Sequence, residues 1–211
     1  MMGATSEQDS VAYDRERPAH EVELSSYYIG ETEVTQELWE AVMGGNPSRF
    51  TGNPKLPVET VTWNDCQEFI QQLNQLTGKN FRLPTEAEWE RAARGGNNSK
   101  GYKYAGSDNL VDVAWYANID GANTKEVATK SPNELGLYDM SGNVWEWCQD
   151  YYAYYNASGE KEVNPTGPES GTDRVYRGGS WNYNAVGCRV SHRNHATESH
   201  KLQNLGFRLA L

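Results

Sequence analysis

Cysteine and long hydrophobic runs are both scarce in this sequence of 211 residues. The three cysteines, Cys66, Cys148 and Cys188, form no C-x-x-C pair and allow at most one disulfide bond, which excludes a disulfide-stabilised scaffold. No stretch approaches the roughly 20 apolar residues that a membrane-spanning helix needs. Residues 1–10 also lack the basic and apolar regions of a signal peptide. We therefore expect no membrane insertion, and no segment here that directs export.

Positive charge is also in short supply. The chain has 19 Lys and Arg against 29 Asp and Glu, which gives a net charge of -10. A surface of this sign repels a phosphate backbone, so we expect no nucleic-acid partner. The G-x-G-x-x-G, P-loop, H-E-x-x-H and G-x-S-x-G motifs are absent as well. Their absence argues against the common nucleotide-binding and zinc-protease sites.

The aromatic residues that are present carry mostly polar tips. The chain has 13 Tyr and 7 Trp but only 4 Phe. Tyr and Trp combine apolar area with a hydrogen-bonding group, which suits a fold rich in loops. The length suits one compact domain.

Apolar spacing and capping residues predict three helices and one strand in the first half of the chain. The helices are expected at residues 36–43, 64–76 and 85–94, and the strand at residues 22–29. Thr35 is expected to cap the first helix and Asn64 the second, while Thr85 begins a capping box for the third.

The second helix is expected to bury one stripe. Cys66, Phe69 and Leu76 belong to this stripe, so Cys66 is predicted to be a core residue. From residue 97 onward, short aromatic runs between turn residues predict loops and short strands. Helices in the first half and irregular β structure in the second indicate an α+β domain without βαβ alternation.

One pair of carboxylates suggests a metal site. Asp139 and Glu146 flank a glycine-containing turn, where backbone carbonyls can join side-chain oxygens around a hard cation such as calcium. On spacing alone, the favoured alternative is that Asp139 begins a turn and Glu146 is a strand carboxylate paired with an arginine.

The C-terminal region holds three of the four histidines. His192, His195 and His200 follow Cys188, but they lack the spacing of a recognised metal site and are interpreted as solvated loop residues. For Cys188, two interpretations remain open: a buried inert thiol, or a reactive thiol whose pKa is lowered by the neighbouring Arg189.

Several blocks of sequence resemble one known family. They occur in order along nearly the whole chain, and they are MMGA (residues 1–4), EVT (33–35), VTWND (61–65), FRLPTEAEWE (81–90), GLYDMSGNVWEW (136–147), RGGSW (177–181) and LGFR (205–208). This set is similar to the signature blocks of the formylglycine-generating enzyme, or sulfatase-modifying factor, family. The resemblance implies that residues 1–211 form a single, irregular α+β domain related to C-type lectins, with the strand that usually precedes the first block missing.

The resemblance also implies an enzymatic activity, and the family's two catalytic cysteines can be compared with the residues of this chain. The family's oxidase uses copper and two cysteines, five positions apart, to convert a sulfatase cysteine to formylglycine. Cys188 matches the second cysteine, but Tyr183 occupies the position of the first, and a phenol is poorly suited to Cu(I). Copper is therefore not expected. The family's calcium site maps onto Asp139, Gly142, Val144 and Glu146, so a structural calcium ion is expected. The second calcium site, at residues 118 and 119, is expected to be absent because its completing loop is deleted.

The fold of this family also serves as a binding scaffold, including in variable proteins that retroelements diversify. Residues 181–204 have the placement of the ligand surface in such proteins and the mixed polar and aromatic composition that it needs. The leading hypothesis is a non-catalytic domain that binds a protein, peptide or glycan, and the alternative is a copper-dependent oxidoreductase. The predicted ligand-binding residues are Trp145, Ser180, Trp181, Tyr183, His192, His195 and His200. Relatives often work outside the cytoplasm, so the resemblance favours an extracytoplasmic location.

Overall fold

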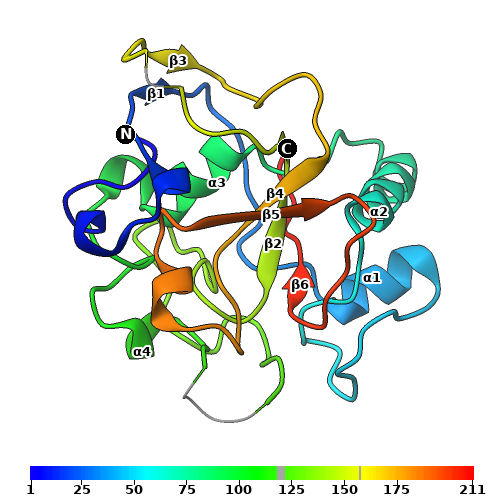
Figure 1. The fold of residues 1–211 in the computed structure, drawn as a ribbon. Coiled ribbons are helices and arrows are strands. Elements are labelled where there is room, and N and C mark those ends of the chain that lie inside the picture. Colours follow the sequence, from blue (N-terminus) through cyan, green and yellow to red (C-terminus); the bar gives the residue numbers. More distant parts are fainter. Residues whose placement is uncertain (118–121, 157) are drawn as a thin grey trace.

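A four-stranded sheet lies at the centre of the molecule (Figure 1). The computed structural model describes residues 1–117, 122–156 and 158–211. The strand order in the sheet is β5 (Arg193–Thr197), β4 (Asp173–Arg177), β2 (Trp145–Tyr151) and β6 (Leu205–Gly206). Strand β4 is antiparallel to both β2 and β5, whereas β6 pairs parallel to β2. This arrangement is an α+β fold with short strands, as the sequence predicts.

Helices flank the sheet, and their ends follow the expected caps. They are α1 (Gln36–Met43), α2 (Trp63–Thr77), α3 (Glu86–Ala93) and α4 (Leu110–Val113). The predictions for α1 and α3 are confirmed, with Thr35 and Thr85 as their caps. The predicted cap of α2 is wrong, because Thr62 caps the helix two residues earlier than Asn64. Thr62 and Asp65 form a capping box, which starts the helix at Trp63.

The other elements are short. They are the 3₁₀ turns η1 (Asp9–Val11), η2 (Asp14–Glu16), η3 (Gly96–Asn98) and η4 (Ala185–Cys188), and the strands β1 (Val22–Glu23) and β3 (Glu162–Val163), which pair in parallel. The predicted strand at residues 22–29 is therefore too long. Its ladder ends where Ser25 donates its N–H to the side chain of Asn164, and Tyr28 then pairs with Leu211 near the C-terminus.

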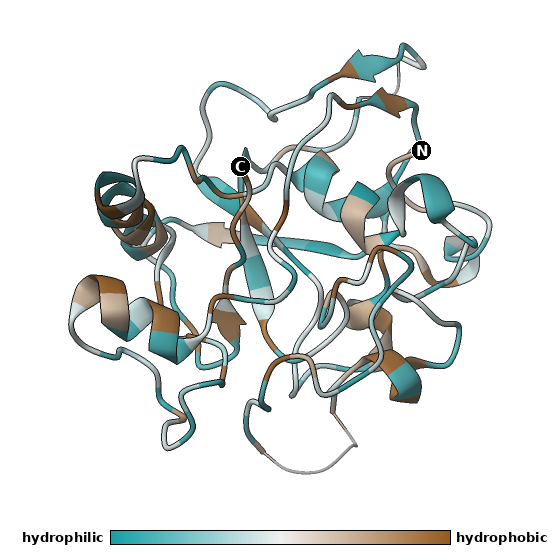
Figure 2. Ribbon diagram, turned by 180° about the vertical axis from the view of Figure 1, so that it is seen from behind, coloured by the Kyte–Doolittle hydropathy of each residue, from teal (hydrophilic) through white to brown (hydrophobic). Residues whose placement is uncertain are grey.

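The two faces of the sheet belong to different layers. On β2, Trp145 and Trp147 pack into the cluster that contains α1 and α2, whereas Cys148 packs with Trp89 of α3 on the other face. Side chains that alternate along a strand produce this division. Both α1 and α2 carry apolar and polar residues, brown and teal in Figure 2, as expected of helices with one buried side. The sheet is thus covered by helices on both faces.

Helix α2 buries most of the predicted stripe. Cys66 and Phe69 are fully buried, which confirms Cys66 as a core residue, but Leu76 is 69% exposed and its assignment to the core is wrong. Leu76 lies in the last turn of α2, which ends at Thr77. In the described part of the chain, no helix is both long enough and apolar enough to cross a bilayer.

Buried ion pairs connect α3 with the sheet. Arg177 of β4 binds Glu90, and Arg193 of β5 binds Glu86 with Nε 2.7 Å from Oε1. Both arginines are at most 2% exposed. A buried charge of this kind is tolerated only when it is paired and hydrogen-bonded. These pairs fix α3, and therefore the face of the sheet that α3 covers.

Candidate functional site

Tyr183 packs into an aromatic cluster just before η4. Its ring stands edge-on to Trp145, with centroids 5.1 Å apart, and its centroid lies 6.1 Å from that of His192. The ring also lies against Gly187, because a Cβ added to that glycine would be 2.1 Å from Tyr183 Cδ1. At the position that the resemblance assigns to the first catalytic cysteine, the structure therefore holds a packed, half-buried phenol.

Cys188 is a buried thiol with 0% exposure. Its Sγ lies 3.7 Å from the backbone carbonyl oxygen of Asn184. Burial raises the pKa of Cys188 to about 12, so the thiol stays protonated at neutral pH. Arg189 does not lower this pKa, because its guanidinium group turns to Glu16 instead. Of the two interpretations that the sequence leaves open, the structure supports the buried inert thiol.

Glu16 joins the N-terminal region to the residues that follow η4. Its two carboxylate oxygens accept hydrogen bonds from Nη1 and Nη2 of Arg189, both at 2.7 Å, and Ser191 Oγ donates at 2.6 Å. His192 Nδ1 lies 3.6 Å from Oε1. Burial alone would raise the pKa of Glu16, but the hydrogen bonds from His192, Arg189 and Ser191 lower it well below its usual value.

The interpretation of His192 as a solvated loop residue is wrong. Its side chain is 0% exposed and lies between Glu16 and the aromatic cluster, 5.6 Å from Trp145 between ring centroids. Burial lowers the pKa of His192. The sequence gives no sign of this position, because the partner at Glu16 is 176 residues away. His192 is thus a buried residue of the aromatic cluster, and its role in ligand binding stays a prediction.

Three other predicted ligand-binding residues are buried as well. Trp145, Ser180 and Trp181 are 2%, 0% and 8% exposed. Ser180 Oγ donates to Asn182 Oδ1 at 2.9 Å, and Asn204 Nδ2 donates to the same oxygen at 2.7 Å. Asn182 itself is exposed, and the sequence analysis did not single it out. The three side chains are therefore buried, whereas Asn182 is the exposed member of the network, and the role of the three in ligand binding stays a prediction.

His195 and His200 lie apart from this cluster. His195 is on β5, where Nδ1 lies 2.6 Å from Asp173 Oδ2 and the ring stacks on Tyr152 at 3.8 Å. Both histidines are partly exposed, His200 in the loop after β5. In the described ranges, no group of three or more His, Cys, Asp or Glu side chains is placed to hold a metal ion. The C-terminal histidines and Cys188 are thus not brought together.

The candidate calcium ligands lie at the start of β2. Asp139 has a positive φ of 57° and begins a turn, with Oδ2 accepting the N–H of Ala128 at 2.8 Å. Glu146 is on β2 and is held by Arg208, whose Nε and Nη2 lie 2.6 and 2.7 Å from its two oxygens. Both features match the alternative in which Asp139 begins a turn and Glu146 pairs with an arginine. They leave the calcium prediction itself untested.

The same region nevertheless has an excess of buried negative charge. Glu33, from the EVT block, is 1% exposed and accepts the N–H of Val144 at 3.1 Å. The buried carboxylates of Glu33, Asp139 and Glu146 all lie near enough to the buried Arg208 to raise its pKa. Asp139 Oδ1 is buried and has no hydrogen-bond partner among the described residues. Burial raises the pKa of Asp139 to about 6. An unpaired buried oxygen beside excess negative charge fits a bound cation.

The second predicted calcium site, at residues 118 and 119, lies outside the residues that the structure describes.

The fold and these blocks define a class of protein, a C-type-lectin-like domain of the formylglycine-generating-enzyme type. The sequence matches the family described as sulfatase-modifying factor enzyme 1-like domain over residues 1–211. The chain therefore belongs to this family, which confirms the resemblance seen in the sequence.

Similar proteins carry different names: an enzyme, a chaperone protein and a variable protein. The formylglycine-generating enzyme of Streptomyces coelicolor is 41% identical over 79% of this chain and 56% of its own length. A protein of Paenibacillus barcinonensis named chaperone protein LppX is 36% identical over 76% of this chain and 71% of its own. The solved structure of Treponema denticola variable protein 1 has a TM-score of 0.89 and 37% identity, covering 100% of this chain and 92% of that one.

Proposed function

We propose that this domain binds a ligand without catalysing formylglycine formation. The observation that carries the proposal is the pair of residues at the family's cysteine positions. Tyr183 is packed against Trp145 and Gly187, and Cys188 is buried with its pKa raised to about 12. One protonated thiol and one phenol do not supply the two thiolates that the family's Cu(I) site needs.

The proposed ligand surface is formed by the exposed residues between positions 181 and 204. Asn182 and Asn184 are exposed there, and Tyr183 and His200 are partly exposed. The buried network beneath them fixes their positions, which lowers the entropy lost on binding. The close similarity to a solved structure named as a variable protein supports the same proposal. Its ligand would be a protein, a peptide or a glycan.

The catalytic alternative predicts turnover, whereas our proposal predicts none. Incubation with copper, a reductant and a cysteine-containing sulfatase-type peptide should leave the mass of the peptide unchanged. Tyr183→Cys restores the missing thiol position, and turnover by this variant alone would show that the surrounding cleft has been retained. Turnover by the unaltered protein would contradict the proposal.

Substitutions on the proposed surface should lower the affinity for a ligand without changing the free energy of unfolding. Tyr183→Phe and His200→Ala remove polar groups that make no side-chain hydrogen bond in the described structure, so each should change the free energy of unfolding by less than about 0.5 kcal/mol. His192→Ala should cost about 1–3 kcal/mol, because Glu16 loses a buried partner.

The binding part of this prediction needs a probe. Ligands selected from a phage-displayed peptide library and a glycan array should lose affinity for the Tyr183→Phe/His200→Ala double variant. Tyr28→Ala is the matched control, since Tyr28 is 77% exposed and lies near the C-terminus instead. Equal loss in the control, or unfolding of the double variant, would argue against this surface.

We further propose that a structural calcium ion is held by the side chains of Asp139 and Glu146 and by the carbonyl groups of Gly142 and Val144. The unpartnered Asp139 Oδ1 and the excess of buried carboxylates support this proposal. Chelation should lower the melting temperature, because an ion that binds only the native state stabilises it, by about 2.7 kcal/mol at one hundred times its dissociation constant. Asp139→Asn should remove this sensitivity, and an unchanged melting temperature on chelation of the wild type would refute the site.

A further inference from the structure

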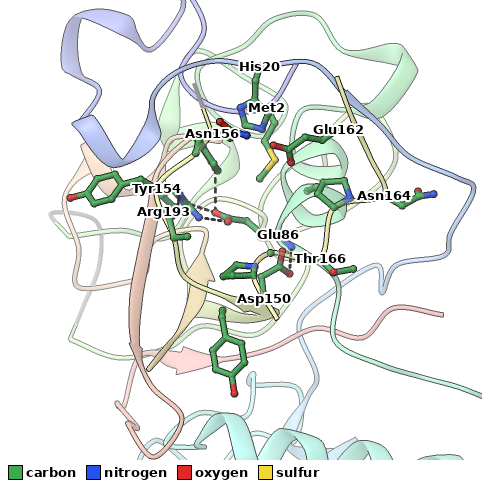
Figure 3. Close-up of a pocket in the computed structure, with 17 residues that line it drawn as sticks. Met2, His20, Glu86, Asp150, Tyr154, Asn156, Glu162, Asn164, Thr166 and Arg193 are labelled. Carbon is green, nitrogen blue, oxygen red and sulfur yellow. Dashed lines mark hydrogen bonds and ion pairs between the residues drawn. The ribbon is translucent and has the colours of Figure 1, made fainter. Parts of the chain in front are cut away.

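A pocket lies at the far end of β2 from Tyr183. Its volume is about 600 Å³, within the range of small-molecule sites. It is bounded by the start of α3, the end of β2, the start of β5, the first residue of β3, and Met2 and His20 near the N-terminus (Figure 3). Because β2 runs from Trp145, beside Tyr183, to Tyr151, which lines this pocket, the two regions are separated by the length of the strand.

Two buried carboxylates form the floor of the pocket, and only one of them is neutralised. Glu86 is bound by Arg193 through both oxygens, and Tyr155 also donates to it. Arg193 further donates to the backbone carbonyl of Ala153 at 2.8 Å. Among the described residues that line the pocket, Arg193 is the one permanently charged cation. It forms its ion pair with Glu86.

Asp150 is the carboxylate without a counter-charge. It is 4% exposed, and its Oδ2 accepts the N–H of Glu86 at 2.8 Å. No other residue in the described part of the chain donates a hydrogen bond to Oδ1, although Asp150 lines the pocket. Burial and the charge of Glu86 raise the pKa of Asp150 to about 7. A carboxylate oxygen that lines a cavity and accepts no hydrogen bond from another described residue can accept one from a ligand.

The rest of the lining restricts the chemistry of that ligand. Glu162 of β3 adds a third carboxylate, so the residues that line the pocket include more carboxylates than permanently charged cations (Figure 3). Met2, Tyr151 and Pro165 add apolar surface beside the carboxylates. This combination favours a positively charged group attached to a short apolar chain over an anion or a neutral polar molecule.

We propose that this pocket binds a primary ammonium group on a short alkyl chain, with Asp150 Oδ1 as its main acceptor and Glu162 as a second carboxylate. A free alkylamine and the lysine side chain of a polypeptide share this chemistry. The site is separate from the ligand surface proposed above, and neither depends on the other.

The direct test is calorimetric titration of the whole chain with n-butylamine, with N-acetyl-lysine methylamide, and with n-butanol as the neutral control. Both amines are expected to bind and to shift the NMR amide signals of Glu86 and Asp150, whereas n-butanol should do neither. Tighter binding of n-butylamine would identify a free amine as the source, and tighter binding of the lysine derivative would identify a side chain. Absence of binding by both amines up to about 10 mM, or equal binding of n-butanol, would overturn the proposal.

Charge-removing variants test which carboxylates are involved. Asp150→Asn keeps an oxygen for the N–H of Glu86 but removes the charge, so it should weaken amine binding about tenfold or more. Glu162→Gln should weaken binding about twofold to fivefold, as expected for a partly exposed ion pair. Glu160→Gln is the matched control, because Glu160 is exposed two residues away and does not line the pocket. Equal affinities of Glu162→Gln and Glu160→Gln would overturn the role of Glu162 even if Asp150→Asn failed to fold.

Discussion

Replacement of Arg189 by alanine should lower the free energy of unfolding by about 3–5 kcal/mol. The guanidinium group is 1% exposed and provides both of its terminal nitrogens to Glu16 at 2.7 Å. Its removal leaves Glu16, itself fully buried, as a carboxylate without its main counter-charge. Urea unfolding followed by tryptophan fluorescence measures this loss.

A double replacement is the control for this result. Glu16→Gln combined with Arg189→Met removes both charges while keeping much of their volume, so it should cost less than Arg189→Ala alone. The effect should also depend on pH. Since the hydrogen bonds hold the pKa of Glu16 below its usual value, its charged form stabilises the fold above the unfolded-state pKa, and this contribution is lost as the pH falls below about 4. A loss under about 1 kcal/mol at neutral pH would show that the pair is not structural.

Replacement of Phe69 by alanine should cost about 3–5 kcal/mol. Phe69 is fully buried, stacks on Trp39 with centroids 5.0 Å apart, and meets Phe207 edge-on at 5.4 Å. The side chain thus joins α2 to both α1 and the C-terminal segment, and its loss leaves a cavity where three elements meet. Urea unfolding gives the free energy directly.

Leu76→Ala is the matched control on the same helix. Leu76 is 69% exposed, so its truncation should change the free energy of unfolding by less than about 0.5 kcal/mol. If Phe69→Ala cost no more than Leu76→Ala, the packing of α2 against α1 and the C-terminal segment would be wrong.

The helices could be predicted from the sequence because their signals are local. Thr35 and Thr85 lie next to the turns that they cap, and the stripe of Cys66 and Phe69 repeats within a few residues. The same locality explains the errors at the ends of α2. Thr62 forms a capping box that Asn64 does not, and apolar spacing alone does not show that the last turn of α2 leaves Leu76 exposed.

The candidate site was harder to predict, because its residues are positioned by distant partners. His192 belongs to a polar stretch, and partners far away in the chain, Glu16 and Trp145, make it a buried residue. Trp145 and Ser180 were selected by resemblance, which identifies equivalent positions but not exposure. No sequence motif surrounds Asp150. It is identified as a candidate ligand acceptor only because it lines the pocket and because Arg193 pairs with Glu86 instead.

The contacts of the N-terminal segment determine when the molecule can fold. Glu16 pairs with Arg189, the N–H of Gly30 donates to Leu209, and that of Val34 donates to Phe207. Because most of these partners are separated by almost the entire sequence, the chain must close very long loops before the contacts form, and such topologies fold slowly. On the ribosome, Glu16, Gly30 and Val34 therefore cannot form these contacts until residues 189–209 have left the exit tunnel.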